Sequence, residues 1–124
     1  MNNKDLLKIA DEFGTPVYVY NAESIKEQYE KLSSSFGKNT KFFYAAKALT
    51  NINILKYIEK LGANLDCVSI NEVKLGLKAG FPANRILFTP NCVDLAEIEE
   101  AMSHKVHINI DNTSILEQFG NKFG

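Results

Sequence analysis

Several features that would narrow the function are scarce or missing from this sequence of 124 residues. The formal net charge is −1, because 14 lysines and arginines nearly balance 15 aspartates and glutamates, so charge does not favour nucleic acid or an anionic membrane as a partner. No apolar stretch is long enough to cross a bilayer, and the first residues lack the uninterrupted apolar core of a signal peptide. We therefore expect a cytoplasmic protein that binds neither nucleic acid nor membrane.

Cysteine is also rare. Cys67 and Cys92 form no C-x-x-C pair and have no histidine or cysteine cluster near them, which disfavours a metal site and a disulfide framework. We expect two reduced thiols with packing or bystander roles. Hydrolase motifs of the types G-x-S-x-G and H-E-x-x-H are missing as well. The sequence is 45% hydrophobic and 23% charged, which is the composition of an ordinary globular domain.

Apolar runs rich in aromatic and β-branched residues alternate with segments of helical period, at a spacing of roughly 22 residues. This alternation is typical of βα units around a parallel sheet. We predict strands at Val17–Tyr20, Phe42–Ala46, Leu65–Val68, Ile86–Phe88 and Val106–Ile110. Single apolar stripes between the strands predict helices that include the segments Ile25–Leu32, Ile54–Leu61, Val73–Leu77 and Leu95–Met102.

Glycines and serines mark the expected helix ends. Gly62 and Gly80 each follow a helical segment and precede a strand, which predicts left-handed glycines just past the helix ends. Three S-x-x-E spacings predict capping boxes at helix starts, namely Ser24 with Glu27, Ser69 with Glu72, and Ser114 with Glu117.

Repeated βα units can build either an open doubly wound sheet or a (β/α)8 barrel, and the period alone does not choose between them. No G-x-G-x-x-G follows a predicted strand, which disfavours a dinucleotide-binding fold. A complete barrel needs roughly 250 residues. We therefore expect an α/β protein whose residues 1–124 form one domain, the N-terminal half of a truncated TIM-type barrel.

The stretch KFFYAAKAL, residues 41–49, places a lysine at the end of an apolar strand. Strand alternation puts Phe43, Ala45 and Lys47 on one face, with Lys47 at the carboxyl end, where α/β folds bind ligands. The neighbouring alanines leave space around it. Burial would lower the pKa of such a lysine and allow its amine to form a Schiff base with an aldehyde cofactor. The structural alternative is a strand-end lysine that extends into water.

Five segments together resemble the N-terminal part of the diaminopimelate decarboxylases, which belong with the ornithine and arginine enzymes to the fold-type III pyridoxal-phosphate decarboxylases. These segments are Tyr44–Ala48, Gly14–Tyr20, Leu65–Glu72, Leu77–Pro82 and Asn109–Asn112. The resemblance runs from about Phe13 to the end of the chain. Two departures, Leu49 in place of asparagine and Ile70-Asn71 in place of two glycines, remove no group that performs chemistry.

This resemblance implies an alanine-racemase-like barrel that binds pyridoxal 5′-phosphate, with Lys47 as its covalent attachment point. Asp66 would lie beside the lysine and the cofactor, and a carboxylate there would hold a released lysine in its charged form. Its structural alternative is a solvated acid at a strand end. Glu72 would also bind near the cofactor, although its capping-box partner Ser69 offers an adequate structural explanation.

Other polar residues are weaker candidates. His107, Asn109 and Asp111 alternate with apolar residues, so one face of the last predicted strand is polar, and Asn109 is the best candidate to line the site. Satisfied polar groups are commoner than ligands at such positions. His104 is expected only to complement a helix dipole.

The implied reaction is the decarboxylation of meso-diaminopimelate to L-lysine and CO2. The family completes its site with a glycine-rich phosphate loop, substrate-binding arginines and a cysteine from a C-terminal β domain across a homodimer interface, and we expect none of these within residues 1–124. Cys67 and Cys92 do not match that cysteine's motif. We expect the isolated chain to be inactive.

Three alternatives to this function stay open. The first is another decarboxylase of this type that acts on ornithine, arginine or carboxynorspermidine. The others are a non-catalytic pyridoxal-phosphate-binding barrel and a structural fragment in which Lys47 is incidental.

Overall fold

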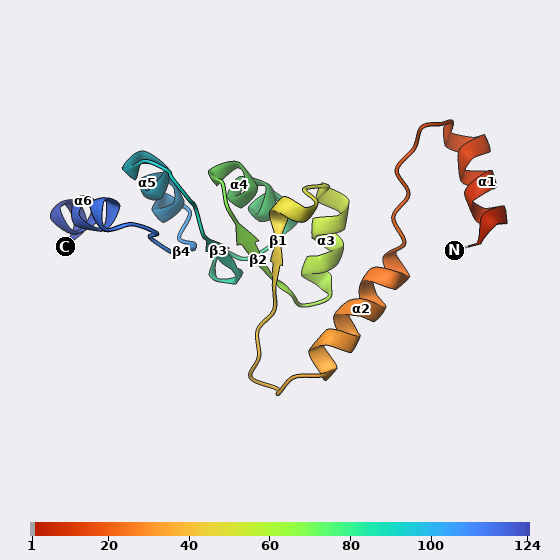
Figure 1. Cartoon of the computed structure of the whole chain (residues 1–124), viewed down its shortest axis with the longest axis horizontal. Coiled ribbons are helices and arrows are strands. Elements are labelled where there is room, and N and C mark those ends of the chain that lie inside the picture. Colours follow the sequence, from red (N-terminus) through yellow and green to blue (C-terminus); the bar gives the residue numbers. More distant parts are fainter. Residues whose placement is uncertain (1) are drawn as a thin grey trace. The chain divides into compact units, whose positions relative to one another are not determined.

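The computed structural model describes residues 2–124 (Figure 1). Contacts group the chain into two compact units, the first ending at Gly37 and the second running from Lys38 to Gly124. The first unit contains helices α1 (Asn3–Phe13) and α2 (Ala22–Ser34). All strands of the described chain belong to the second unit. The assignment of all 124 residues to one barrel domain stays a prediction.

The strand predicted at Val17–Tyr20 is wrong. These residues lie between α1 and α2 without regular secondary structure, and 89% of Tyr18 is exposed. Aromatic and β-branched residues favour a strand only where a neighbouring strand can pair with their peptide groups. No strand of the described chain pairs with this segment, so its local preference has no effect.

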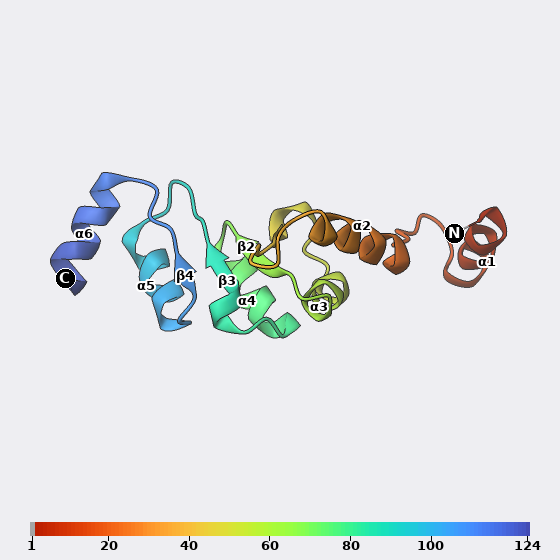
Figure 2. The same cartoon turned by 90° about the horizontal axis from the view of Figure 1, so that it is seen from below.

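The second unit is an α/β structure built on a parallel sheet in the order β1-β2-β3-β4, which confirms the predicted fold class. The strands are β1 (Phe43–Ala45), β2 (Asn64–Cys67), β3 (Ile86–Phe88) and β4 (His107–Ile108). The helices that follow them are α3 (Ile52–Lys60), α4 (Ile70–Ala79), α5 (Leu95–Ser103) and α6 (Thr113–Phe123). Two short 3-10 turns, η1 (Ala46–Ala48) and η2 (Ala83–Arg85), complete the unit. Figures 1 and 2 show α3, α4 and α5 side by side along the sheet.

Strand register divides the sheet into two faces. Tyr44, Leu65 and Ile86 occupy one row of paired residues and therefore point to one face. That face meets α4, because a Cβ atom built on Gly76 of α4 would collide with the Leu65 side chain and lie 3.4 Å from that of Ile86. Glycine at position 76 thus allows α4 to approach the sheet closely. The core lies between this face and the helices, where Leu65, Ile86 and the α3 residue Leu55 are fully buried.

Some of the observed helix ends agree with those predicted from the sequence. Gly62 and Gly80 have φ angles of 96° and 106°, which confirms both predicted left-handed glycines. Ser69 caps α4, because its Oγ accepts a hydrogen bond from the backbone N–H of Glu72 at 3.3 Å.

The other two predicted capping boxes are wrong. Helix α2 begins two residues before Ser24, and the Asn21 side chain caps it by accepting from the N–H groups of Glu23 and Ser24. Helix α6 likewise begins before Ser114, with Asn112 as its cap. Asparagine caps helices as well as serine does, so the upstream asparagine sets the start in each case.

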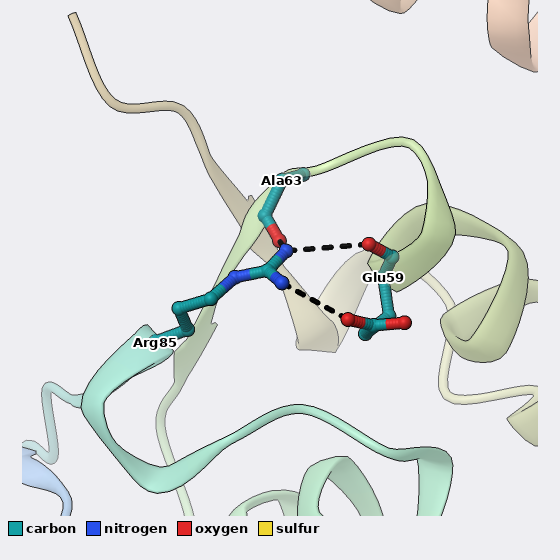
Figure 3. Close-up of polar contacts among 3 residues, drawn as sticks. All are labelled: Glu59, Ala63 and Arg85. Atoms are coloured by element: carbon teal, nitrogen blue, oxygen red, sulfur yellow. Dashed lines mark hydrogen bonds and ion pairs between the residues drawn. The ribbon is translucent and has the colours of Figure 1, made fainter. Parts of the chain in front are cut away.

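A charged cluster links the amino ends of β2 and β3 (Figure 3). Arg85, the last residue of η2, donates from Nη1 to the Glu59 carboxylate at 2.9 Å. Its Nη2 donates to the backbone oxygens of Glu59 at 3.2 Å and of Ala63 at 2.5 Å. Both side chains of the ion pair are about three-quarters buried, with 27% and 25% exposed. Arg85 therefore ties the connection between α3 and β2 to the start of β3.

Candidate functional site at the carboxyl ends of the strands

The sequence-predicted site residues lie around the carboxyl ends of β1 and β2. Ala45 pairs with Asp66, which pairs with Leu87, and Leu87 pairs with His107. These four residues form one row and point to the sheet face opposite α4. Carboxyl ends of parallel strands form the ligand-binding rim of α/β proteins. Asp66 and the segment that follows Ala45 therefore lie at the same rim of the sheet.

Lys47 lies in η1, immediately after β1, and its side chain is exposed. The predicted strand to Ala46, with Lys47 continuing its alternation, is wrong at this point. The chain turns after Ala45, Ala46 is fully buried, and a hydrogen bond from Leu49 N–H to the Ala46 oxygen at 3.1 Å closes the turn. The predicted burial of Lys47 is therefore wrong, because the turn leaves its side chain exposed to solvent. Its amine is accessible to a small molecule.

Asp66 is half-buried in β2 and hydrogen-bonded to the neighbouring strand segment. The Thr89 hydroxyl, one residue past β3, donates to Asp66 Oδ1 at 2.6 Å. Thr89 is not among the site residues predicted from the sequence. A usable signal was present, since Thr89 is the first polar residue after a predicted strand and must lie at the same rim as Lys47 and Asp66.

Glu72 serves the start of α4. Its Oε2 accepts a hydrogen bond from the Val68 N–H at 2.7 Å, one residue earlier in the chain than the reciprocal bond of a capping box would reach. A carboxylate in the first helical turn also complements the helix dipole. The predicted capping box is therefore only half formed, because Ser69 caps the helix while Glu72 accepts from Val68. A cofactor contact by Glu72 stays a prediction.

The pKa of the Cys67 thiol reflects the negative charges near this rim. Its side chain is fully buried, and burial together with the nearby carboxylates of Glu72 and Asp66 raises the pKa of the thiol to about 12. Both acids therefore act on the last residue of β2. The expected packing role of Cys67 is confirmed by its burial, whereas Cys92 is exposed.

The last strand is shorter than the predicted Val106–Ile110. Strand β4 covers His107 and Ile108, although the Asn109 N–H extends the ladder with a bond of 2.9 Å to the Phe88 oxygen. The register places His107 on the same face as Asp66. Asn109 is exposed, and its role in lining a site stays a prediction. His104 ends α5 as its C-cap residue, the place expected for a group that complements the helix dipole.

Comparison with protein-family models matches residues 22–123 to the pyridoxal-binding domain of the pyridoxal-dependent decarboxylases. The chain belongs to this decarboxylase family. Pyridoxal 5′-phosphate is the cofactor that this family membership implies. The matched range includes β1 to β4, and so all of the rim residues described above.

Individual decarboxylases agree with this assignment. The diaminopimelate decarboxylase of Methanothermobacter thermautotrophicus is 41% identical over 115 residues, which cover 90% of this chain and 27% of that protein. The crystal structure of lysine/ornithine decarboxylase from Vibrio vulnificus, complexed with putrescine, matches with a TM-score of 0.87 at 25% identity, covering 96% of this chain and 33% of that one. The diaminopimelate decarboxylase of M. jannaschii, in co-complex with L-lysine, gives 0.83 at 30% identity, covering 96% and 30%.

This pyridoxal-binding chain thus spans about a quarter to a third of the length of the decarboxylases it matches. Their structures carry the barrel type predicted from the sequence, and the parallel βα units described here correspond to part of it. Within the described residues, no helix has both the length and the apolar character needed to cross a membrane.

The rim residues fit the pyridoxal group in their chemistry. An aldehyde needs an accessible primary amine, which Lys47 presents in solvent directly after β1. A nearby carboxylate stabilises a protonated amine, and Asp66 lies on the adjacent strand, where its carboxylate accepts a hydrogen bond from Thr89. Residues 2–124 contain no cluster of three or more histidine, cysteine, aspartate or glutamate side chains suited to a metal ion.

Proposed function

We propose that this chain is the cofactor-binding N-terminal part of a pyridoxal-phosphate-dependent amino-acid decarboxylase. The observation that supports it best is the place of Lys47. Its accessible amine stands directly after β1, within the motif Y-A-A-K-A, and Asp66 is paired with Ala45 on the neighbouring strand. Lys47 would hold the cofactor through this amine.

Each proposed site residue has a distinct task. When bound, pyridoxal phosphate supplies an electron sink for the carbon that loses CO2. The amine of Lys47 would bind the cofactor and, once released by the substrate, hold a proton. The Asp66 carboxylate would favour the charged form of that amine. Glu72 would bind near the cofactor, and its carboxylate also holds the turn between β2 and α4 through the Val68 N–H.

We propose meso-diaminopimelate as the substrate, which would give L-lysine and CO2. The relative that is 41% identical is a diaminopimelate decarboxylase, which supports this choice. The lysine/ornithine decarboxylase structure matches with a high TM-score, and this favours a basic amino acid such as ornithine as the second candidate. Arginine, carboxynorspermidine and a non-catalytic pyridoxal-phosphate carrier remain the further alternatives. A downstream segment with a C-E-S-G-D-like motif would rule out the carrier.

We further propose that the 124-residue chain alone does not decarboxylate and that the complete enzyme is a cytoplasmic homodimer. Strands β1 and β4 each have one neighbour in the described sheet, so their outer edges carry unpaired peptide groups. Such edges favour association with further strands. Steady CO2 release from diaminopimelate by the purified chain with pyridoxal phosphate would contradict the proposed inactivity.

Labelling tests the cofactor assignment directly. The chain is titrated with pyridoxal phosphate, reduced with borohydride and digested, and the modified lysines are quantified by mass spectrometry. We expect Lys47 to be labelled at lower cofactor concentration than Lys41 and Lys78, which are also exposed. The variant K47R should lose this high-affinity label, whereas K41R should keep it. Equal labelling of all exposed lysines would refute Lys47 as the binding residue.

A further inference from the structure

We propose that Thr89 is a positioning residue, whose hydroxyl orients the Asp66 carboxylate toward the amine of Lys47. This inference rests on the proposed function, because it concerns the same rim. It adds a third strand to the site, since Lys47 follows β1, Asp66 belongs to β2 and Thr89 follows β3.

The backbone of Thr89 is fixed beside the end of β2. Its N–H donates to the Cys67 oxygen at 2.8 Å, which continues the ladder between the two strands by one bond. The hydroxyl oxygen lies 2.6 Å from Asp66 Oδ1 and 3.5 Å from the Cys67 oxygen. A hydroxyl has one proton, and the shorter distance is typical of an O–H group that donates to an ionised carboxylate. Thr89 therefore donates to Asp66.

This bond restricts the carboxylate without neutralising it. Threonine is β-branched and stiff about its first side-chain torsion, so a hydroxyl on a fixed backbone is itself fixed. Asp66 Oδ1 is engaged by Thr89, and Oδ2 is the oxygen that remains for a charged amine. Because Asp66 pairs with Ala45, two residues before Lys47, the carboxylate lies on the strand next to the turn that carries this amine.

The hydrogen bond from Thr89 would order the Asp66 side chain before the cofactor binds. A free aspartate side chain samples several rotamers, and ordering it when the cofactor binds costs affinity. Glu72 has its own backbone donor in Val68, whereas the donor to Asp66 is the Thr89 hydroxyl. Removal of that hydroxyl should therefore act on the cofactor through Asp66 alone.

The first test needs no cofactor. Three-bond NMR couplings about the Cα–Cβ bond of Asp66 are measured in the wild-type chain and in the variants T89V, T89S and T40V. We expect one rotamer in the wild type and in T89S, which keeps the hydroxyl, and averaged couplings in T89V, which is isosteric but cannot donate. Thr40 is exposed before β1, so T40V controls for the same chemical change elsewhere. Unchanged couplings in T89V would overturn the proposal.

The second test uses the labelling of Lys47 by pyridoxal phosphate and borohydride. T89V should need about three- to tenfold more cofactor for half-labelling, as expected for the loss of one hydrogen bond. T89S should restore labelling to near the wild-type concentration. In the D66A background, T89V should have no further effect, because Thr89 then has no carboxylate to hold. An additive effect of the two substitutions would refute action through Asp66.

The two proposals fail in different ways. If the wild-type chain shows no preference for Lys47, the proposed function is wrong, while the couplings still decide whether Thr89 holds Asp66. If Lys47 is preferred but T89V labels like the wild type, the role of Thr89 is wrong and the function stands. Backbone amide spectra of each variant establish that the fold is kept.

Discussion

Arg85 Nη1 lies 2.9 Å from Glu59 Oε1, and the same guanidinium also donates to the backbone oxygens of Glu59 and Ala63. One side chain therefore satisfies three acceptors at the end of α3 and the start of β2. A planar guanidinium with several fixed donors suits such a task, and a lysine ammonium does not have this geometry. The cluster lies at the amino ends of the strands, where barrel residues serve stability.

Replacement of Arg85 should destabilise the chain. R85A removes the donor to the partly buried Glu59 carboxylate and to the Ala63 backbone oxygen, whereas the Glu59 backbone oxygen keeps the N–H of Gly62, so we expect a loss of about 1–3 kcal/mol in the free energy of unfolding. Urea denaturation followed by circular dichroism measures it. The control is K122A, which breaks the more exposed pair with Glu99 and should cost at most about 0.5 kcal/mol. Equal losses in the two variants would contradict the role assigned to Arg85.

A methyl group at position 76 should be costly. In G76A the new Cβ meets Leu65 and Ile86, both fully buried, so α4 must move outward or the core must repack. We expect a loss of about 1–3 kcal/mol from overpacking. G120A is the matched control, because no atom lies within 4 Å of a Cβ built on this glycine of α6. It should be neutral or stabilising by up to about 1 kcal/mol. Similar unfolding curves for the two variants would disprove the close approach of α4.

Ser69 caps a helix and Ser24 does not, so their replacement by alanine should have different effects on stability. S69A should lower stability by about 1 kcal/mol, because Ser69 caps α4 and its removal leaves the Glu72 N–H without an acceptor. S24A should change stability by only a few tenths of a kcal/mol, since Ser24 lies inside α2 and its first turn is capped by Asn21. Thermal unfolding of both variants compares them. A larger loss in S24A than in S69A would be inconsistent with these helix starts.

The thiol of Cys67 predicts a specific dependence on pH. Burial and two acids raise its pKa to about 12 from the ordinary value of 9.0. Between these values the unfolded chain releases a proton that the folded chain keeps, so this contribution to stability is complete below about pH 9 and is lost as the pH rises toward 12. We expect wild-type stability to fall more steeply than that of C67V over this range, with C92S behaving like the wild type. Parallel curves for wild type and C67V would exclude the effect.

Alkylation checks the same thiol under native conditions. Cys92 is exposed and should react readily with iodoacetamide, whereas buried Cys67 should react only on unfolding. Equal rates at the two cysteines would show that the core around β2 opens easily.

The sequence predicted the architecture well where the signal was local. The bounds of β3 agree with the predicted Ile86–Phe88, and both left-handed glycines are where the helix ends were expected. These features depend on short apolar runs and on the backbone preference of single residues. The Val17–Tyr20 segment has an equally apolar pattern but no pairing strand, and pairing is a property of distant residues.

The candidate site residues could be chosen from the sequence, whereas their geometry could not. Lys47 and Asp66 follow from the motifs that the chain shares with its family, and the structure places both at the rim. The turn after Ala45 was missed because strand alternation was continued past the last paired residue. The position of Thr89 after a predicted strand indicates the rim, but its bond to Asp66 joins residues 23 apart in sequence and depends on the strand register.

The cluster around Arg85 and the bond from Thr89 to Asp66 lie at opposite ends of the same two strands. We therefore expect substitutions at the carboxyl rim to leave the contacts of Arg85 at the amino ends intact. Such a separation favours single mutations that alter the chemistry of the rim while the sheet beneath keeps its shape.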